Sequence, residues 1–240
     1  MFFFKKKKII VEVFTHRKGV LECSKPKLAI KYAPDWWKKC PMNYVPDGGF
    51  FEDATIKTCP AFVGLYTTGL IIPMWCDLAL EMSPIGENHY RWQFADEESH
   101  LSSHTFQQIN NHLDPNEYSH FKFTSPWAIR TKEDINWMWM QPDWNHLKNY
   151  DYKVASGLRN FKTTHGTHIN IFAKKHSETR TLLIKHLEPL VHLVPLVNDG
   201  RKIELKYNLV SSDEFNNFST YSTSFLRPSS FCINARKNAN

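Results

Sequence analysis

The chain has 240 residues, of which 42% are hydrophobic and 22% charged, and its formal net charge is +6. These proportions are typical of a globular chain of one large domain and exclude a disordered one. Only 9 residues are glycine, which disfavours an α/β nucleotide-binding fold, because that fold needs glycine-rich turns. Aromatic residues make up 14% of the chain, and they favour strands.

The N-terminus carries a basic run directly after three phenylalanines. The run consists of Lys5, Lys6, Lys7 and Lys8. It predicts either a solvated terminus or a contact to an anionic surface, such as nucleic acid or a neighbouring subunit. A signal peptide is not expected, because the apolar residues precede the lysines instead of following them.

The first third of the chain predicts short strands separated by turns. Residues 9–16 alternate as a strand does and end at a Lys-Gly turn, and residues 27–32 suggest a second short strand. Asp35 is placed to cap one helical turn that carries two tryptophans. Residues 41–49 end in Pro-Asp-Gly-Gly and predict a loop.

Residues 57–80 are apolar and rich in threonine, and they predict two buried strands on either side of Thr67–Gly69. The uncharged part, 60–76, is too short and too interrupted to span a membrane. Residues 90–94 predict another strand. Residues 96–112 form the best helical candidate, because Leu101, Phe106 and Ile109 give a partial apolar stripe, although the segment is also polar enough for a loop.

The segment 121–210 predicts a run of strands. Trp137 and Trp139 alternate with Met138 and Met140, so both faces of that strand are expected to be covered. We therefore expect a mainly β fold, a β-sandwich or jelly-roll with a short helix or helical turns. Residues 1–210 form a single β-rich domain in this interpretation. Residues 211–240 form a polar tail that packs on the domain or on a neighbour.

Twelve histidines make a metal site worth considering. Non-haem iron is held by two histidines and one carboxylate on a rigid β scaffold. His186 and Glu188 are two residues apart and would share one strand face, with His192 on the same face if the strand continues. His168 faces away from Ile169 and Ile171 and could enter a polar cavity with Asn170. The simpler alternative is that these are ordinary polar-face histidines.

Other signatures of catalysis or metal binding are weak. The chain lacks a GxSxG elbow, a phosphate-binding loop, an HExxH pair and a GxGxxG fingerprint. Asp96, His100 and His104 would share a helical face and could bind a metal, but a solvated acidic helix start is the favoured interpretation. The five cysteines include no CxxC pair, which disfavours a disulfide framework and a zinc ribbon and favours reduced cysteines.

The tryptophans between residues 127 and 144 give the stronger indication of a contact surface. Trp144 follows Gln-Pro-Asp and is expected in a surface loop, where tryptophans serve as interface anchors. The residues predicted to bind a partner are Trp127, Trp137, Trp139 and Trp144. The alternative is that they form the core.

Several short motifs resemble an uncharacterised β-rich family of marine cyanophages and some bacteria. They are Cys59-Pro60, the Gly69–Pro73 segment, Ser125–Thr131 and Glu188–Leu196, and the resemblance covers about residues 55–200. It implies a compact β-rich domain, a phage source and a location in the host cytoplasm or the virion. It transfers no catalytic residue. The family favours glycine where this chain has Glu188, so the turn there is expected to differ.

Two functions follow from these patterns. The first is a non-catalytic, phage-related structural or binding protein that acts through an aromatic-rich surface, without a cofactor, as a homo-oligomer or as part of a larger assembly. The second is a metal-dependent oxygenase-like enzyme that holds non-haem iron on a jelly-roll scaffold.

Overall fold

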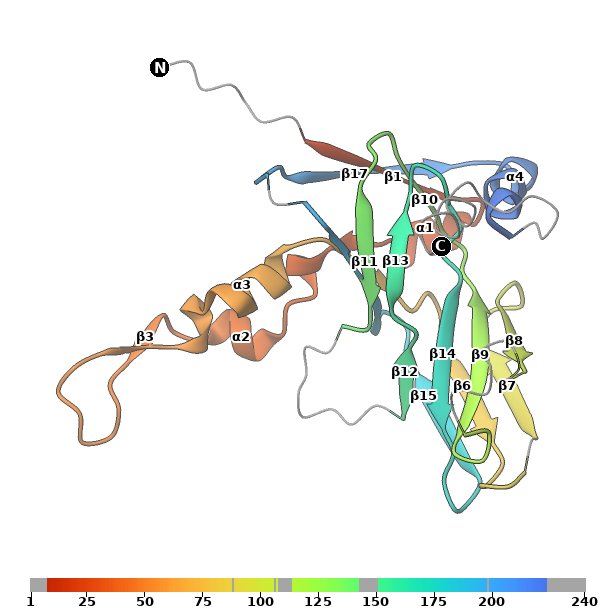
Figure 1. Ribbon diagram of the computed structural model, residues 1–240, viewed down its shortest axis with the longest axis horizontal. Helices are drawn as coiled ribbons and strands as arrows, with labels where there is room; N and C mark the ends of the chain where they lie inside the picture. The colour runs from red at the N-terminus through yellow and green to blue at the C-terminus, as the bar shows by residue number, and fades with distance from the viewer. Residues whose placement is uncertain are drawn as a thin grey trace, which may run out of the picture.

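The computed structural model describes residues 8–87, 89–105, 107, 114–142, 151–197 and 199–223 (Figure 1). The chain is mainly β with a few short helices, as the sequence predicts. The described strands form several sheets, in which almost every neighbouring pair is antiparallel. None of the described helices combines the length and the apolar character needed to cross a membrane.

One sheet joins the two ends of the described chain. Its central strand β1 (Ile9–Thr15) pairs with β10 (Ala128–Thr131) in antiparallel fashion and with β17 (Ile203–Leu209) in parallel fashion. Val11 and Val13 point into the core and are fully buried. The predicted strand at 9–16 is therefore confirmed, and β17 falls within the run of strands predicted for 121–210.

A second sheet has five strands. Its order is β13 (Gly157–Asn160), β11 (Asn136–Met140), β16 (Pro189–Pro195), β5 (Leu70–Pro73) and β2 (Lys27–Leu28). Strand β5 is buried along its whole length. In β11 the two tryptophans are buried and the two methionines half-buried, so the expected alternation is confirmed.

Two further sheets pack face to face. One contains β12 (Tyr152–Val154), β14 (Ile169–Lys174), β9 (Tyr118–Thr124) and β8 (His100–His104), and the other contains β15 (Arg180–Ile184), β6 (Leu78–Met82) and β7 (Tyr90–Phe94). Aromatic rings join them: Tyr90 meets Phe121 at 5.2 Å and Phe94 meets Phe123 at 6.4 Å between ring centroids. Together with the first two sheets they enclose one apolar core.

The described helices are short and lie outside the sheets. They are α1 (Lys18–Cys23), α2 (Asp35–Lys39), α3 (Pro60–Thr67) and α4 (Ser212–Thr223), with 3₁₀ turns at Ala29–Lys31 and Ile56–Thr58. Helix α4 begins the polar tail. Its Phe215 is buried against Phe14 and Ala128, so the start of the tail packs on the domain.

The structure corrects several predicted elements. Of the strand predicted at 27–32 only Lys27–Leu28 is extended, and the predicted Lys-Gly turn is the start of α1. Residues 60–67 form helix α3 instead of a strand, because Pro60 occupies the first helical position and Tyr66 then faces a small apolar cluster. Residues 100–104 form strand β8 instead of a helix, because Leu101 pairs with Phe123 and fills the core between the sheets. The rest of the predicted helix, beyond residue 105, lies almost entirely outside the described residues.

Residues 29–67, called the arm here, project away from the sheets (Figure 1). The inner half is held by Trp37 and Tyr66, whose rings meet at 4.9 Å. The ammonium group of Lys57 lies 3.9 Å from the Trp37 ring centre and donates to the Trp37 carbonyl at 2.9 Å. The outer half is a hairpin of β3 (Asn43–Tyr44) and β4 (Asp53–Ala54), and residues 43–54 are called the tip.

Gly69 forms the joint between the arm and the body. Its φ of +85° favours glycine, and a Cβ there would lie 2.0 Å from the Leu193 carbonyl oxygen. The His192 side chain also holds this turn, because its Nε2 lies 2.7 Å from the Thr68 carbonyl oxygen. The direction of the arm is therefore fixed where it leaves β5.

Candidate functional site

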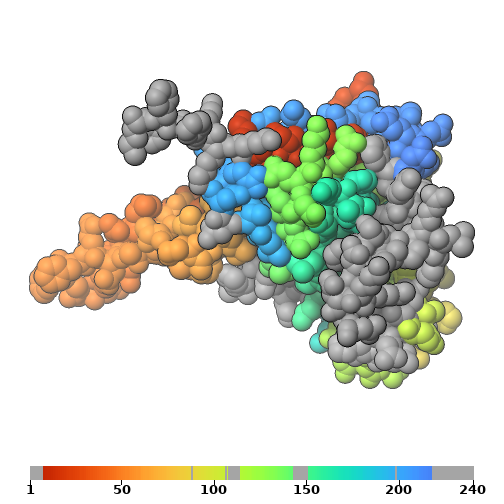
Figure 2. Space-filling model, turned by 45° about the horizontal axis from the view of Figure 1, so that its top comes forward, coloured from red at the N-terminus to blue at the C-terminus, as the bar shows by residue number. Residues whose placement is uncertain are grey.

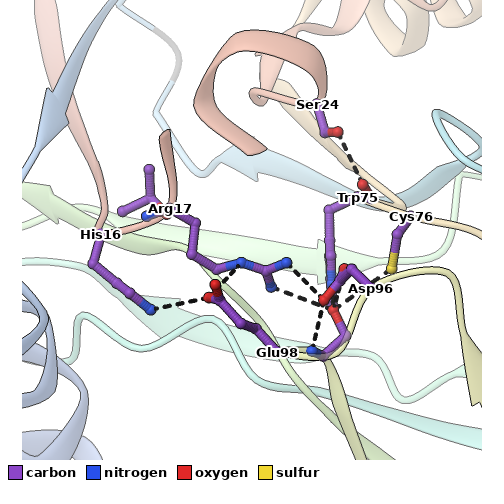
Figure 3. A network of polar contacts seen from close by, with 9 residues as sticks. His16, Arg17, Ser24, Trp75, Cys76, Asp96 and Glu98 are labelled. Atoms are coloured by element: carbon purple, nitrogen blue, oxygen red, sulfur yellow. Dashed lines mark hydrogen bonds and ion pairs between the residues drawn. The ribbon is translucent and has the colours of Figure 1, made fainter. Parts of the chain in front are cut away.

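The most connected polar cluster of the described chain surrounds Arg17, between β1 and the β7–β8 turn (Figure 3). The guanidinium group binds Asp96 at 2.8 Å and Glu98 at 3.1 Å. Ser99 donates from its backbone and its hydroxyl to Asp96, both at 2.8 Å, and accepts from the Trp75 indole at 2.7 Å. The cluster therefore joins the N-terminal strand to two later parts of the chain.

The protonation states of this cluster do not suit nucleophilic or acid–base catalysis. Burial and the nearby Asp96 raise the pKa of the Cys76 thiol to about 12, so the thiolate form is suppressed. Burial alone would raise the pKa of Asp96. The hydrogen bonds from Cys76, Arg17 and Ser99, together with the Arg17 charge, outweigh burial and lower that pKa to about 2.

The charges of the cluster are compensated internally. The Arg17 side chain is 10% exposed and two carboxylates share its charge. His16 lies 3.7 Å from Glu98 at the edge of the cluster. The Arg17 charge is therefore paired within the fold, and these contacts tie β1 to the β7–β8 turn.

The predicted metal ligands His186 and Glu188 lie in a turn and not on a strand. Strand β16 begins only at Pro189, and Leu187 has a φ of +65°. His186 lies 2.8 Å from the Ser24 hydroxyl, which itself donates to the Trp75 carbonyl at 3.0 Å. Glu188 accepts from the Tyr152 hydroxyl at 3.3 Å. The two side chains thus contact different partners, and the shared strand face that would have directed both at one ion does not exist.

The other two predicted ligands occupy further separate places. His192 is fully buried, and its Nε2 carries the proton, because the Thr68 carbonyl can only accept. Burial lowers the pKa of His168 to about 4, with smaller contributions from the charges of Lys122 and Arg159. Among the described residues no three histidine, cysteine, aspartate or glutamate side chains lie together as a metal site would require. The structure therefore does not bring the predicted iron ligands together.

The tryptophans predicted as partner contacts are mostly core residues. Trp127, Trp137 and Trp139 are between 0% and 4% exposed. This corrects the prediction of a contact role for these three, because their rings fill the interior between the sheets and no surface remains for a partner. Trp144 lies outside the described residues, as do Lys5, Lys6 and Lys7. Lys8 is described and pairs with Glu204 at 2.6 Å.

The exposed aromatic surface lies on the arm instead. Half of the large apolar side chains that are exposed in the described chain lie between residues 36 and 56. At the tip, Phe50 is 95% exposed and Phe51 85% exposed, and Tyr44 and Val45 lie about half exposed beside them. In the space-filling view the orange arm stands clear of the main body (Figure 2). Two adjacent phenylalanines so fully exposed are unusual for a surface without a partner.

The sequence predicts a loop at 41–49, but the exposed phenylalanines that follow it were not predicted as a contact surface. The signal was available: Phe50-Phe51 follow Pro-Asp-Gly-Gly directly, and acidic residues follow them. A phenylalanine pair beside a strong turn motif has no strand partner in sequence that would bury it. The pattern alone did not reveal that the turn sits far from the core.

No protein-family model, curated protein or solved structure matches the chain. The function proposed below therefore rests on the geometry of the molecule.

Proposed function

We propose that this protein is a non-catalytic structural or binding protein that contacts another molecule through the tip of its arm. The observation that carries the proposal is the exposure of Phe50 and Phe51, 95% and 85%, at the end of an element that projects from the body. The resemblance described above implies a phage source, so the particular form of this function would be a virion component or a phage binding module.

The energetics favour a contact role for these rings. A buried phenylalanine side chain contributes roughly 1.5–3 kcal/mol relative to an exposed one, and the folded chain gains none of this at the tip. A partner that covers both rings would gain it. Aromatic side chains in the centre of an interface commonly supply most of its binding energy.

The tip is also preorganised for a contact. The Thr55 hydroxyl donates to the Pro41 carbonyl, and the Thr55 backbone donates to Met42 at 2.9 Å. Across the hairpin, the Asn43 amide donates to Glu52 at 3.1 Å. A hairpin that is already ordered loses less conformational entropy when it binds.

The polar cluster around Arg17 supports the non-catalytic part of the proposal. Its carboxylates neutralise the guanidinium group, and its thiol is held protonated. These groups contribute to the fold and leave no reactive centre among them.

The test is photo-cross-linking with a benzophenone amino acid placed at Phe51. The matched control carries the same group at Leu183, an exposed apolar position of the body. Both proteins are illuminated in an extract of cells that contain the protein, and the adducts are identified by mass spectrometry. We expect a discrete adduct from position 51 and none from position 183. Equal or absent cross-linking at the two positions would contradict the proposal.

A further inference from the structure

The tip is acidic as well as aromatic. Residues 43–54 contain Asp47, Glu52 and Asp53 and no lysine or arginine. The whole chain has a net charge of +6. The aromatic surface therefore carries the opposite sign to the rest of the molecule, which favours a basic partner and disfavours an anionic membrane or nucleic acid.

A notch of about 430 Å³ lies at the other end of the arm, where the arm meets the first sheet. Thr67–Gly69 and Leu28 form its arm side, and Ile9 and Ile203 come from β1 and β17. Pro195 and Val197 extend the apolar wall. The volume lies within the range of pockets that hold compact apolar groups.

Three charged residues line this notch, and one of them leaves a positive charge exposed. They are Asp199, Arg201 and Lys202. The Arg201 guanidinium group forms ion pairs with Asp199 and Glu133. Lys202, by contrast, is an exposed residue of the notch lining. The apolar walls match the aromatic rings of the tip, and the exposed Lys202 among them matches its carboxylates.

The tip of the same molecule does not reach this notch. The notch is lined by Thr67–Gly69 at the base of the arm, and the hairpin lies at its far end (Figure 1). The packed pair Trp37 and Tyr66 and the constrained Gly69 hold the arm extended. Occupation of the notch by a tip therefore requires a second molecule.

We infer that the partner of the tip is a second copy of this chain, and that Phe50 and Phe51 of one copy seat in the notch of the next. This inference rests on the proposed contact function of the tip and names its partner. Tip and notch are different surfaces, so the contact is head-to-tail. Repetition of such a contact produces a ring if the rotation closes and a filament if it does not.

The first test is the association state of the full chain, measured by sedimentation velocity over a concentration series. We expect the wild type to form either a closed ring or an open assembly larger than a dimer. The double variant Phe50→Ser/Phe51→Ser should raise the dissociation constant about tenfold or more, because it removes the aromatic anchors. The control Leu183→Ser, on the exposed side of β15, should leave the dissociation constant unchanged.

A charge exchange tests whether the notch is the receiving surface. Glu52→Lys/Asp53→Lys reverses the charge of the tip. Lys202→Glu/Lys206→Glu reverses the charge of Lys202 in the notch lining and of the exposed Lys206 further along the same segment. Each pair alone should weaken association about tenfold, and their combination should restore most of it, because the carboxylates then meet lysines with the signs exchanged. Lys153→Glu/Lys174→Glu, on the four-stranded sheet, matches the charge change of the notch variant and should not rescue the tip variant.

The outcomes separate this inference from the proposed function. A wild type that stays monomeric at all concentrations, or an oligomer that none of the tip and notch variants weakens, would overturn the second-copy inference. A cross-link from position 51 to a different molecule would overturn it as well, while leaving the contact function of the tip intact. Absence of any cross-link from position 51 would contradict both the second-copy inference and the contact function of the tip.

Discussion

The body and the arm use the same kind of side chain in opposite ways. In the body, Trp137 is fully buried and its ring meets Phe161 at 6.0 Å. At the tip of the arm, Phe50 is 95% exposed. The aromatic content of the chain is therefore divided between a core that stabilises the fold and a surface that does not. Mutations in the two regions should separate stability from association.

The largest expected effect comes from the core. Trp137→Ala should lower the free energy of unfolding by about 3–5 kcal/mol, because it leaves a large cavity between the sheets. Trp36→Ala on the arm, where the ring is 44% exposed, should cost less than about 1 kcal/mol. Urea denaturation of both variants measures this difference. Equal losses would mean that the arm belongs to the same packed core as the body.

The joint between the two regions should be the next most sensitive position. Gly69→Ala combines an unfavourable φ with a Cβ placed 2.0 Å from the Leu193 carbonyl oxygen, and it should cost about 2–3 kcal/mol. Gly64→Ala is the matched control within α3, because a Cβ there meets no atom within 4 Å. It should stabilise the protein by about 0.5–1 kcal/mol. Thermal unfolding of the two variants should therefore shift in opposite directions.

The polar cluster attaches the N-terminal segment to the body. Arg17→Met should cost about 2–3 kcal/mol, because Asp96 and Glu98 lose their counter-charge, although the exposure of Glu98 moderates the loss. The pKa of Asp96 is lowered to about 2, so its contribution is present above about pH 4 and is lost as the pH falls toward 2. Denaturation at several pH values should show that this acid-sensitive part is smaller in the variant, where only Cys76 and Ser99 still donate to Asp96. Lys38→Met, whose partner Asp35 is highly exposed, should change stability by less than about 0.5 kcal/mol.

The half-buried His168 of the body should make stability pH-dependent in a higher range. Burial lowers the pKa of His168 from 6.5 to about 4. Below pH 6.5 the unfolded chain therefore takes up a proton that the folded chain does not, and stability falls as the pH decreases toward 4. The contribution is on the order of 2 kcal/mol. His168→Gln should reduce the slope of stability against pH between 6.5 and 4. The rest of the slope should remain, because burial also lowers the pKa of His120, His165 and His192. An unchanged slope would contradict a neutral His168 in the folded chain.

The sequence predicted the body better than the arm for a physical reason. Alternation of apolar and polar residues, as at Ile203, Leu205 and Tyr207, indicates a strand with one face packed against the core. The sequence therefore predicts strands at the positions of β1, β7 and β17. Short apolar runs do not carry this information, since 60–67 suits a buried strand and a packed helix equally well. Strand β8 was missed because Leu101 finds its partner Phe123 through a distant pairing that local periodicity does not contain.

The candidate site was harder to predict, because exposure is a property of the whole fold. Trp137 and Phe50 each lie in a short run with a second aromatic residue, Trp139 or Phe51, and only the tertiary structure shows that one run is buried and the other exposed. The metal hypothesis required His186, Glu188 and His192 to share one strand face. The turn at Leu187 ended the strand before that face could form.

The central claim is that the exposed rings of the tip serve contact and not stability. Phe50→Ser/Phe51→Ser tests it most directly when unfolding free energy and association are measured on the same samples. We predict an unfolding free energy of the dilute, unassociated protein within about 0.5 kcal/mol of the wild type, together with the loss of association. A variant that is several kcal/mol less stable, or that associates as the wild type does, would contradict it.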